Sequence, residues 1–436
     1  MSPEKLGYGV VPFWEAVLNL PAMVKNPIPV LKGFFEKYGD SYLMKRGDSL
    51  FIFTQNPLLI KHVLQKNHRN YKKSEMQTGR LTRFIGHGLL TSEGDYWRQQ
   101  RRLIQPSFGR EKIRALAGVM KDEACTFFDE FDQENKNQVD VNHMMMNLTF
   151  SIVAKALFGT GISAETILEL RKGVEAGENL VIKLLRAPFL EKFFKLSGRF
   201  KKTFELIKVT DDVLMGIIEK RKAESDQSYN DLLDAFLSAR YEDTGEGMSN
   251  KQLLDESKIM FVAGHETSAN AISWTLYLLS QHAEIFEKVK VSIHDKESTY
   301  LRQVIQESMR LYPPAWLTDR EAIEDDEFEG KLIPKGAVVM TYIYGAQQNA
   351  SFWDRSQVFD PDRFEESSHG DQYFPFGAGP RMCIGNHFAM MEMEIILKEF
   401  ISRYDFKLSK KARIALNPVI TLNPKHGVLM DLARLS

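Results

Sequence analysis

The sequence contains few cysteines, no long apolar run and almost no net charge. Only Cys125 and Cys383 occur among its 436 residues, which is too few for a disulfide framework and typical of a protein from a reducing compartment. The apolar run from Val10 to Leu20 is interrupted by polar residues and a proline, and no basic segment precedes it. It is therefore too short to span a bilayer and unlike an export signal, so we expect a cytoplasmic protein without a transmembrane span.

The charges balance almost completely. The sequence has 57 basic and 58 acidic residues and a formal net charge of -1, so the overall charge does not favour a nucleic acid as a partner. No internal repeat and no low-complexity linker divides the chain. We therefore expect a single, undivided domain over residues 1–436, with a β-rich part at 33–70, 331–345 and 406–430 and helices elsewhere.

Helical periodicity dominates from Asp95 onward, so the chain is predicted to be mainly α with small β-sheets. Two alternating runs, Ser41 to Lys45 and Ser49 to Thr54, predict a hairpin, and the polar stretch from Tyr71 to Leu90 is a candidate mobile loop. Further strands are expected at 338–343, 406–408, 419–422 and 428–430, with a turn signal at 423–424. Helices are expected at 29–38, 56–65, 97–104, 110–131, 141–158, 164–185, 200–223, 231–241, 250–280, 283–292, 300–312 and 386–400.

The stretch from Phe376 to Gly385 places Cys383 on a glycine-rich loop directly before an apolar, helix-like segment. Glycines let the backbone bend tightly and approach a flat partner, and the start of a helix favours the thiolate form of a nearby cysteine. A thiolate that is open on one side suits the axial position of a haem iron. The alternative is a small core cysteine, which is the commoner environment for a free cysteine.

The surrounding residues decide between these two interpretations, because they match the signature Phe-Gly-x-Gly-x-Arg-x-Cys-x-Gly. The sequence thus resembles the cytochrome P-450 superfamily of haem-thiolate proteins. This resemblance implies the cytochrome P-450 fold with a long central helix over the haem, haem b (iron protoporphyrin IX) as the cofactor, and Cys383 as the ligand of its iron. It also implies that the following residues bind the cofactor: Phe376, Gly377, Arg381, Cys383 and Gly385.

A second motif, Ala263 to Thr267, lies inside the long predicted helix 250–280. Glycine within a helix is unfavourable by about 1 kcal/mol relative to alanine, so Gly264 indicates that something approaches the backbone there. The alternative for the acid and the hydroxyl that follow is an ordinary solvated pair. The resemblance implies that Ala263 and Gly264 lie at the cofactor and that Glu266 and Thr267 are catalytic and deliver protons, while we expect His265 to be a packing residue.

An acid and a base at helical spacing form a third motif. Glu307 and Arg310 are neighbours on one helical face, and on a protein surface such a pair contributes little to stability. The resemblance implies instead a buried triad that Arg363 completes. A buried ion pair tolerates desolvation only when it is fully hydrogen-bonded, so we expect these residues to support the cysteine loop without a catalytic role.

Trp97 and Arg101 also share one face of a predicted helix, and for this pair alone a packed indole beside a solvated arginine is the simpler interpretation. The resemblance implies that both bind a haem propionate, and that Arg320 and Arg381 match further propionate-binding positions. Guanidinium groups suit bidentate recognition of carboxylates. Gln347 stands where many members of the superfamily have a basic residue or histidine, which argues against a haem role for it.

The reaction implied by the resemblance is monooxygenation of a C–H bond of a small organic molecule with O2, driven by electrons from a ferredoxin or flavodoxin and its reductase. The sequence resembles marine bacterial members of the superfamily that remove a methyl group from 6-O-methyl-galactose, which predicts a role in carbohydrate catabolism. Hydroxylation of a fatty acid or a terpenoid is the alternative substrate class. A peroxide-driven haem enzyme and a non-catalytic haem sensor are alternatives of other kinds.

Overall fold

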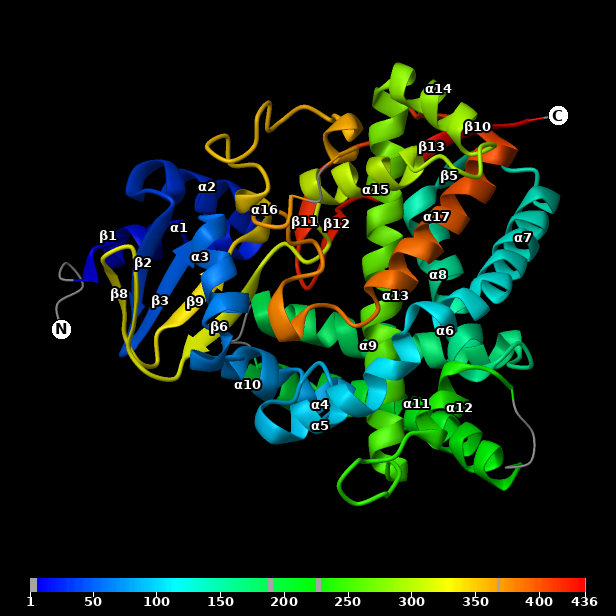
Figure 1. The fold of residues 1–436 in the computed structure, drawn as a ribbon, viewed down its shortest axis with the longest axis horizontal. Helices are drawn as coiled ribbons and strands as arrows, with labels where there is room; N and C mark the ends of the chain where they lie inside the picture. The colour runs from blue at the N-terminus through cyan, green and yellow to red at the C-terminus, as the bar shows by residue number, and fades with distance from the viewer. Residues whose placement is uncertain (1–5, 187–190, 225–228, 367–368, 436) are drawn as a thin grey trace. The chain divides into compact units, whose positions relative to one another are not determined.

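The computed structural model describes residues 6–186, 191–224, 229–366 and 369–435 (Figure 1). The chain divides into two compact units, and each of them is built from separate stretches of sequence. Unit 1 consists of Met1–Ser74, Trp274–Cys383 and Arg413–His426, and unit 2 of Glu75–Ser273, Ile384–Ala412 and Gly427–Ser436. Each unit therefore needs segments from distant parts of the sequence to complete its core.

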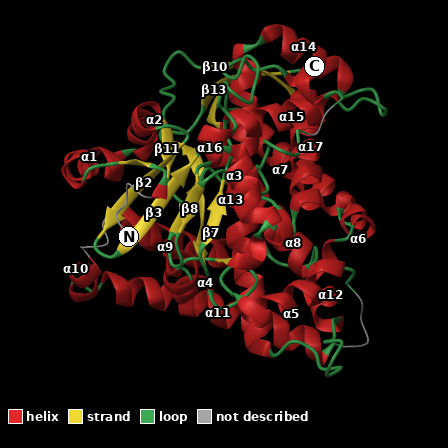
Figure 2. Cartoon of the chain, turned by 60° about the vertical axis from the view of Figure 1, so that its left-hand side comes forward, coloured by secondary structure: helices red, strands yellow, loops and turns green. Residues whose placement is uncertain are grey.

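Unit 1 contains a six-stranded sheet, whose strands are yellow in Figure 2. Alternate residues of its central strands face two different cores. Leu43 and Ile52 pack in a cluster with Leu59, whereas Tyr42 and Phe53 pack in a cluster with residues such as Phe34 and Phe35. In spatial order the strands are β1 (Gly9–Val10), β2 (Ser41–Arg46), β3 (Ser49–Thr54), β9 (Val338–Thr341), β6 (Thr318–Ala322) and β4 (Tyr71–Lys72).

The predicted hairpin is present as strands β2 and β3. Arg46 pairs with Ser49 at the end of the antiparallel ladder, and Gly47 adopts a φ of +60° in the two-residue turn, as such turns require. The predicted β-rich segments 33–70 and 331–345 thus meet in one sheet. Strand β6 was not predicted, because Thr318–Ala322 contains three consecutive charged residues, Asp319, Arg320 and Glu321, and lacks the alternating apolar pattern of a strand.

The helices of unit 1 come from its first two stretches of sequence. The first of them includes Phe13 to Leu20 of the apolar run and was not predicted, since its sequence contains an internal proline, Pro21. The helices are α1 (Phe13–Lys25), α2 (Pro27–Tyr38), α3 (Pro57–Lys61) with the π-helical turn His62–Lys66, α14 (Ala283–Ser292), α15 (Tyr300–Leu311) and α16 (Ile343–Ala346).

One strand prediction in unit 1 is wrong. Residues 419–421 form a turn between two short antiparallel strands, β11 (Leu416–Pro418) and β12 (Leu422–Pro424), so that only Leu422 of the predicted strand lies in one, and Val419 donates its N–H to the carbonyl of Thr421 at 3.1 Å. Asn423 suggested a turn in the sequence, but its side chain accepts a cross-strand hydrogen bond from Asn417 at 2.7 Å. A second small sheet pairs β7 (Asp326–Phe328) with β8 (Lys331–Ile333).

Unit 2 is mainly helical, with one small sheet of β10 (Tyr404–Leu408), β13 (Leu429–Arg434) and β5 (Gln138–Asp140). The helix of 32 residues that runs vertically through Figure 1, α13 (Asn250–Gln281), has its first part in this unit, and a helix of this length extends about 48 Å. The others are α4 (Thr82–Ile85), α5 (Gly94–Ile104), α6 (Arg110–Ala115), α7 (Ala117–Gln133), α8 (Val141–Phe158), α9 (Ala164–Arg186), α10 (Glu191–Leu196), α11 (Arg199–Ala223), α12 (Leu232–Ser238) and α17 (Asn386–Arg403).

The loop predicted to be irregular between Tyr71 and Leu90 contains strand β4, a π-helical turn at Met76–Arg80 and helix α4. Two buried acids of α13 hold its end in unit 2, because Asp255 accepts the N–H of His87 at 3.0 Å and Glu256 accepts the N–H of Leu89 at 3.0 Å. Tertiary hydrogen bonds thus order a segment that has no strong local preference. In the parts of the chain that the structure describes, no helix is long and apolar enough to cross a membrane.

Glu392 of α17 is fully buried, and within the described residues neither its carboxyl oxygens nor the nearby Ser268 hydroxyl has a hydrogen-bond partner of good geometry. Burial raises the pKa of Glu392 to about 8, and Ser268 offsets only part of this effect. Because the folded state favours the protonated acid, this group stabilises the protein fully below its unfolded pKa. That stability is lost as the pH rises through about 8.

In the wild type, the free energy of unfolding should fall by a few kcal/mol between acidic and mildly alkaline pH. We expect Glu392→Gln to abolish this fall, because glutamine does not ionise. Denaturant unfolding across this pH range measures it. Glu130→Gln, at an exposed position of α7, should leave the pH dependence unchanged. Parallel pH profiles of wild type and Glu392→Gln would contradict the assignment.

Candidate haem site

Cys383 is exposed, which argues against a core cysteine. Its loop is closed by a hydrogen bond from the Cys383 N–H to the carbonyl of Phe376 at 2.9 Å. Gly377 and Gly379 adopt φ values of +73° and +67°, a conformation that other residues rarely tolerate. The loop therefore presents its sulfur away from the packed core.

Gly379 is also needed for packing within unit 1. A Cβ atom at this position would lie 2.1 Å from the carbonyl oxygen of Leu64, which belongs to the π-helical turn His62–Lys66. Backbone atoms cannot move aside as the end of a flexible side chain can. The second glycine of the signature thus lets the cysteine loop lie directly against a neighbouring backbone.

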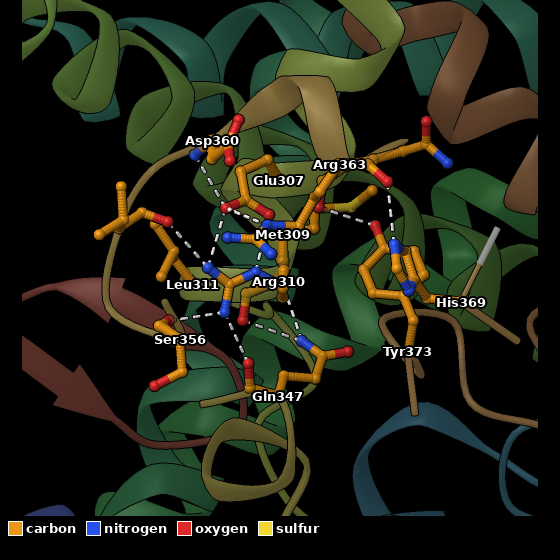
Figure 3. Close-up of polar contacts among 12 residues, drawn as sticks. Glu307, Met309, Arg310, Leu311, Gln347, Ser356, Asp360, Arg363, His369 and Tyr373 are labelled. Atoms are coloured by element: carbon orange, nitrogen blue, oxygen red, sulfur yellow. Dashed lines mark hydrogen bonds and ion pairs between the residues drawn. The ribbon is translucent and has the colours of Figure 1, made fainter. Parts of the chain in front are cut away.

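The buried cluster of Glu307, Arg310 and Arg363 lies in the same unit (Figure 3). Arg310 donates to both carboxylate oxygens of Glu307, at 2.7 and 2.8 Å, and Arg363 Nε donates to Glu307 Oε1 at 3.1 Å. The side chains of Glu307 and Arg310 are 0% exposed. The remaining guanidinium donors of Arg310 bind the carbonyls of Gln347, Ser356 and Val358.

Gln347, for which the sequence predicted no haem role, connects this cluster to the cysteine loop. Its side-chain nitrogen donates to the carbonyls of Met309 and Arg310 at 3.0 and 3.1 Å, and its side-chain oxygen accepts the N–H of Phe374 at 2.8 Å. Phe374 lies two residues before the signature begins. A neutral amide can donate and accept at once, so this role needs no charge.

Breaking the ion pair should destabilise unit 1 strongly. In Arg310→Met, Glu307 loses two of its charge-assisted hydrogen bonds without access to water, so we expect the free energy of unfolding to fall by about 3 to 5 kcal/mol. Lys288→Met is the matched control, because its exposed ion pair with Asp362, at 3.4 Å, should contribute less than about 1 kcal/mol. Denaturant unfolding measures both values, and similar losses in the two variants would contradict the structural role of Arg310.

The second motif lies in the part of α13 that belongs to unit 2. The hydroxyl of Thr267 donates to the carbonyl of Ala263 at 2.8 Å, as threonine does within helices when it competes with the backbone N–H. A Cβ atom at Gly264 would lie 3.0 Å from Cγ2 of Val153 on α8. Close packing of two helices therefore gives this position a reason of its own to be glycine.

Gly264→Ala tests this explanation. Alanine gains about 1 kcal/mol of helix propensity, but overpacking against Val153 should outweigh it by about 1 to 2 kcal/mol. Combining it with Val153→Ala should relieve the clash, so a double-mutant cycle should give a favourable coupling. Gly216→Ala in α11, where nothing lies within 4 Å of the added atom, should only stabilise. Additive effects at positions 264 and 153 would exclude the packing explanation.

The acid and the histidine of this motif are buried, at 8% exposure for Glu266 and 5% for His265. His265 Nδ1 lies 2.6 Å from the carbonyl of Phe261, its ring contacts the edge of Phe150, and its backbone carbonyl accepts the hydroxyl of Thr149 at 3.0 Å. Burial lowers the pKa of His265 to about 4, so the ring is neutral near pH 7. These contacts agree with a packing residue.

The residues predicted to bind propionates divide between the units. Trp97 and Arg101 lie on α5 of unit 2, where Arg101 Nε donates to Gln105 at 3.2 Å. Arg320 lies on β6 and Arg381 on the cysteine loop, both in unit 1. Arg320 is 9% exposed and donates to the carbonyl of Asp319 at 2.6 Å. The structure thus contains one indole and three guanidinium groups at these positions, and each of them can donate hydrogen bonds to a carboxylate.

Residues 9–430 match the family profile described as Cytochrome P450. The chain belongs to this family. It is 29% identical over 434 residues to a cytokinin hydroxylase of Arabidopsis thaliana, with 95% of this chain and 84% of the relative covered. It is 28% identical to echinocystic acid 23-monooxygenase of Saponaria officinalis, with 92% and 83% covered. The solved structure of the cytochrome P450DA haem domain matches with a TM-score of 0.84 and 19% identity over 95% of each chain.

Family membership makes the chain a cytochrome P450 monooxygenase with haem b as its cofactor. The similar solved structure confirms the predicted fold. Cytochrome P450 monooxygenases require O2 and an external source of electrons. The residues present fit a haem, because an exposed thiol on a glycine loop is an appropriate iron ligand and the indole and arginines suit its carboxylates.

Proposed function

We propose that this monooxygenase inserts an oxygen atom from O2 into a C–H bond of a small organic molecule, with Cys383 as the ligand of the haem iron. The observation that carries this proposal is the exposed Cys383 on a loop with two glycines at positive φ, because a core cysteine would be packed away from any ligand. Bound haem would supply the redox chemistry that no side chain of the protein provides.

The remaining site residues then divide into three roles. Arg320 and Arg381, together with Trp97 and Arg101, would hold the propionates. The buried network of Glu307 and its partners would fix the backbone before the cysteine. Thr267 would hold a proton donor in place, since its hydroxyl can accept a hydrogen bond while it donates to the carbonyl of Ala263, and Glu266 would supply the proton from the same turn of α13.

Ferredoxin or flavodoxin, reduced by its own reductase, is the electron donor that we propose for a monomeric cytoplasmic protein. The acid of Glu266 and the hydroxyl of Thr267 support an enzyme that activates O2, because such an enzyme must deliver protons to the reduced oxygen. A peroxide-driven enzyme receives these protons with the peroxide. A haem sensor would need no such pair. NADH-driven turnover with ferredoxin and ferredoxin reductase separates these possibilities.

Two substrate classes fit the proposal. The names of two relatives, a cytokinin hydroxylase and an echinocystic acid 23-monooxygenase, support hydroxylation of a carbon skeleton, for which we propose a terpenoid or a fatty acid. Oxidative demethylation of a methylated sugar, 6-O-methyl-galactose, uses the same step: hydroxylation of the methyl carbon gives a hemiacetal of formaldehyde, which breaks down to formaldehyde and galactose with a free 6-hydroxyl group.

A carbon monoxide spectrum tests the ligand. The reduced holoprotein with carbon monoxide should show the red-shifted Soret band of thiolate ligation, and Cys383→His should lose that band while it still binds haem. Cys125→Ser removes the other thiol and should keep the full band. A thiolate band that survives Cys383→His, or that is lost in Cys125→Ser, would refute the assignment of Cys383.

A spin-state titration tests the substrate. A compound that enters the site and displaces water from the iron should convert the ferric haem from low spin to high spin. We expect this shift with a terpenoid or with dodecanoic acid and none with galactose, which serves as the control. A shift with 6-O-methyl-galactose and none with the apolar compounds would instead establish the sugar as the substrate.

A further inference from the structure

Glu178 of α9 is a buried acid without a cationic partner in the described part of the chain. Its side chain is 15% exposed, and its Oε1 atom has no hydrogen-bond partner among the described residues. Its neighbour on the same helical face, Glu175, is paired with Arg171 at 3.4 Å, and Arg171 also donates to Asn147 of α8. The guanidinium group of Arg171 thus pairs with Glu175 and Asn147 and not with Glu178, whose side chain faces α13.

The group that faces Glu178 is His265, whose Nε2 lies 4.0 Å from Glu178 Oε1. Because His265 Nδ1 lies 2.6 Å from a carbonyl oxygen, which can only accept, the proton of the neutral ring belongs on Nδ1. Nε2 therefore carries a lone pair and cannot donate a hydrogen bond to a carboxylate. A protonated Glu178 can donate toward it, directly after a small movement or through a water molecule.

The charges around this site favour the protonated acid. Burial raises the pKa of Glu178 well above its usual value, and the negative charges of Glu266 and Glu175 raise it further. On α11, which packs along α9, Asp211 is paired with Lys258 and Lys208 with Asp212. On α4, Arg83 is paired with Glu191. The acid of Glu178 thus faces α13 at His265, the residue directly before Glu266, and two neighbouring acids can share and exchange one proton, directly or through a water molecule.

We propose that Glu178 is the outer proton carrier for Glu266, with His265 holding it in place. This inference rests on the proposed role of Glu266 as the proton donor of the reaction. In each transfer the O–H bond of Glu178 breaks, an O–H bond forms on the carboxylate of Glu266, and Glu178 regains its proton from solvent at its exposed edge. Glu178 acts through Glu266 and touches neither substrate nor haem.

Infrared spectroscopy of the resting holoprotein tests the protonation state without turnover. The carbonyl band of a protonated carboxylic acid at pH 7 should be lost in Glu178→Gln. In Glu266→Gln the band should persist and titrate at a lower pH, because one of the charges that oppose ionisation is gone. Glu392→Gln removes a different protonated acid and serves to assign the bands. If Glu178→Gln leaves every protonated-acid band in place, the proposal is wrong.

Coupled turnover tests the transfer, with ferredoxin, its reductase, NADH and the compound that gives the largest spin shift in the titration above. Glu178→Gln should slow product formation about tenfold, less than the 10²–10⁴ of a group that touches the reacting atoms, and should increase hydrogen peroxide release. It should also shift the pH profile and raise the solvent deuterium isotope effect. Glu178→Asp should restore activity, and Glu169→Gln, at an exposed position of α9, should change little.

The outcomes separate this proposal from the one on which it rests. If Glu266→Gln and Thr267→Ala uncouple the enzyme while Glu178→Gln keeps the wild-type pH profile and isotope effect, Glu178 is not the carrier and the role of Glu266 stands. If Glu266→Gln itself stays fully coupled, both proposals fall. A rate loss in Glu178→Gln that Glu178→Asp does not restore, at an unchanged pH profile, indicates a packing role and also overturns the proposal.

Discussion

The fold of unit 1 depends on keeping one carboxylate, Glu307, charged and fully hydrogen-bonded away from water. Arg310 and Arg363 neutralise it, and the N–H of Asp360 adds a further bond at 3.0 Å. The carbonyls that complete Arg310 belong to a long stretch of turns between α16 and α17. This stretch has little regular hydrogen bonding of its own, so the ion pair replaces the ladder that a sheet would provide.

The sequence predicted the long helices well, because their apolar positions recur at helical spacing. Helix α8, expected at 141–158, has these bounds in the structure. It predicted the short strands poorly, since β6 is held by its neighbours β9 and β4 and not by the local preferences of Asp319 or Arg320. The predicted helix 110–131 is likewise broken at Leu116, whose N–H bonds the carbonyl of Ile113, a detail that periodicity cannot resolve.

The residues of the site show a similar division. Cys383 and the glycines of its loop could be found from the sequence because their spacing is specific. Gly264 could be found from the sequence, but its contact with Val153 could not, because that contact depends on how α8 packs against α13. Glu178 could not be found, because its meaning depends on tertiary neighbours that are 87 and 88 residues away in the sequence.

The amide of Gln347 has a further consequence for the loop that follows it. Its nitrogen faces two carbonyls and its oxygen faces one N–H. A rotation of the amide by half a turn would place its oxygen against two carbonyl oxygens and its nitrogen against an N–H group, so all three hydrogen bonds would be lost. Only one of its two orientations is compatible with the surrounding backbone. Because the group does not ionise, this selection is the same at every pH, and the path of the chain toward Cys383 is fixed independently of the titrating acids elsewhere in the protein.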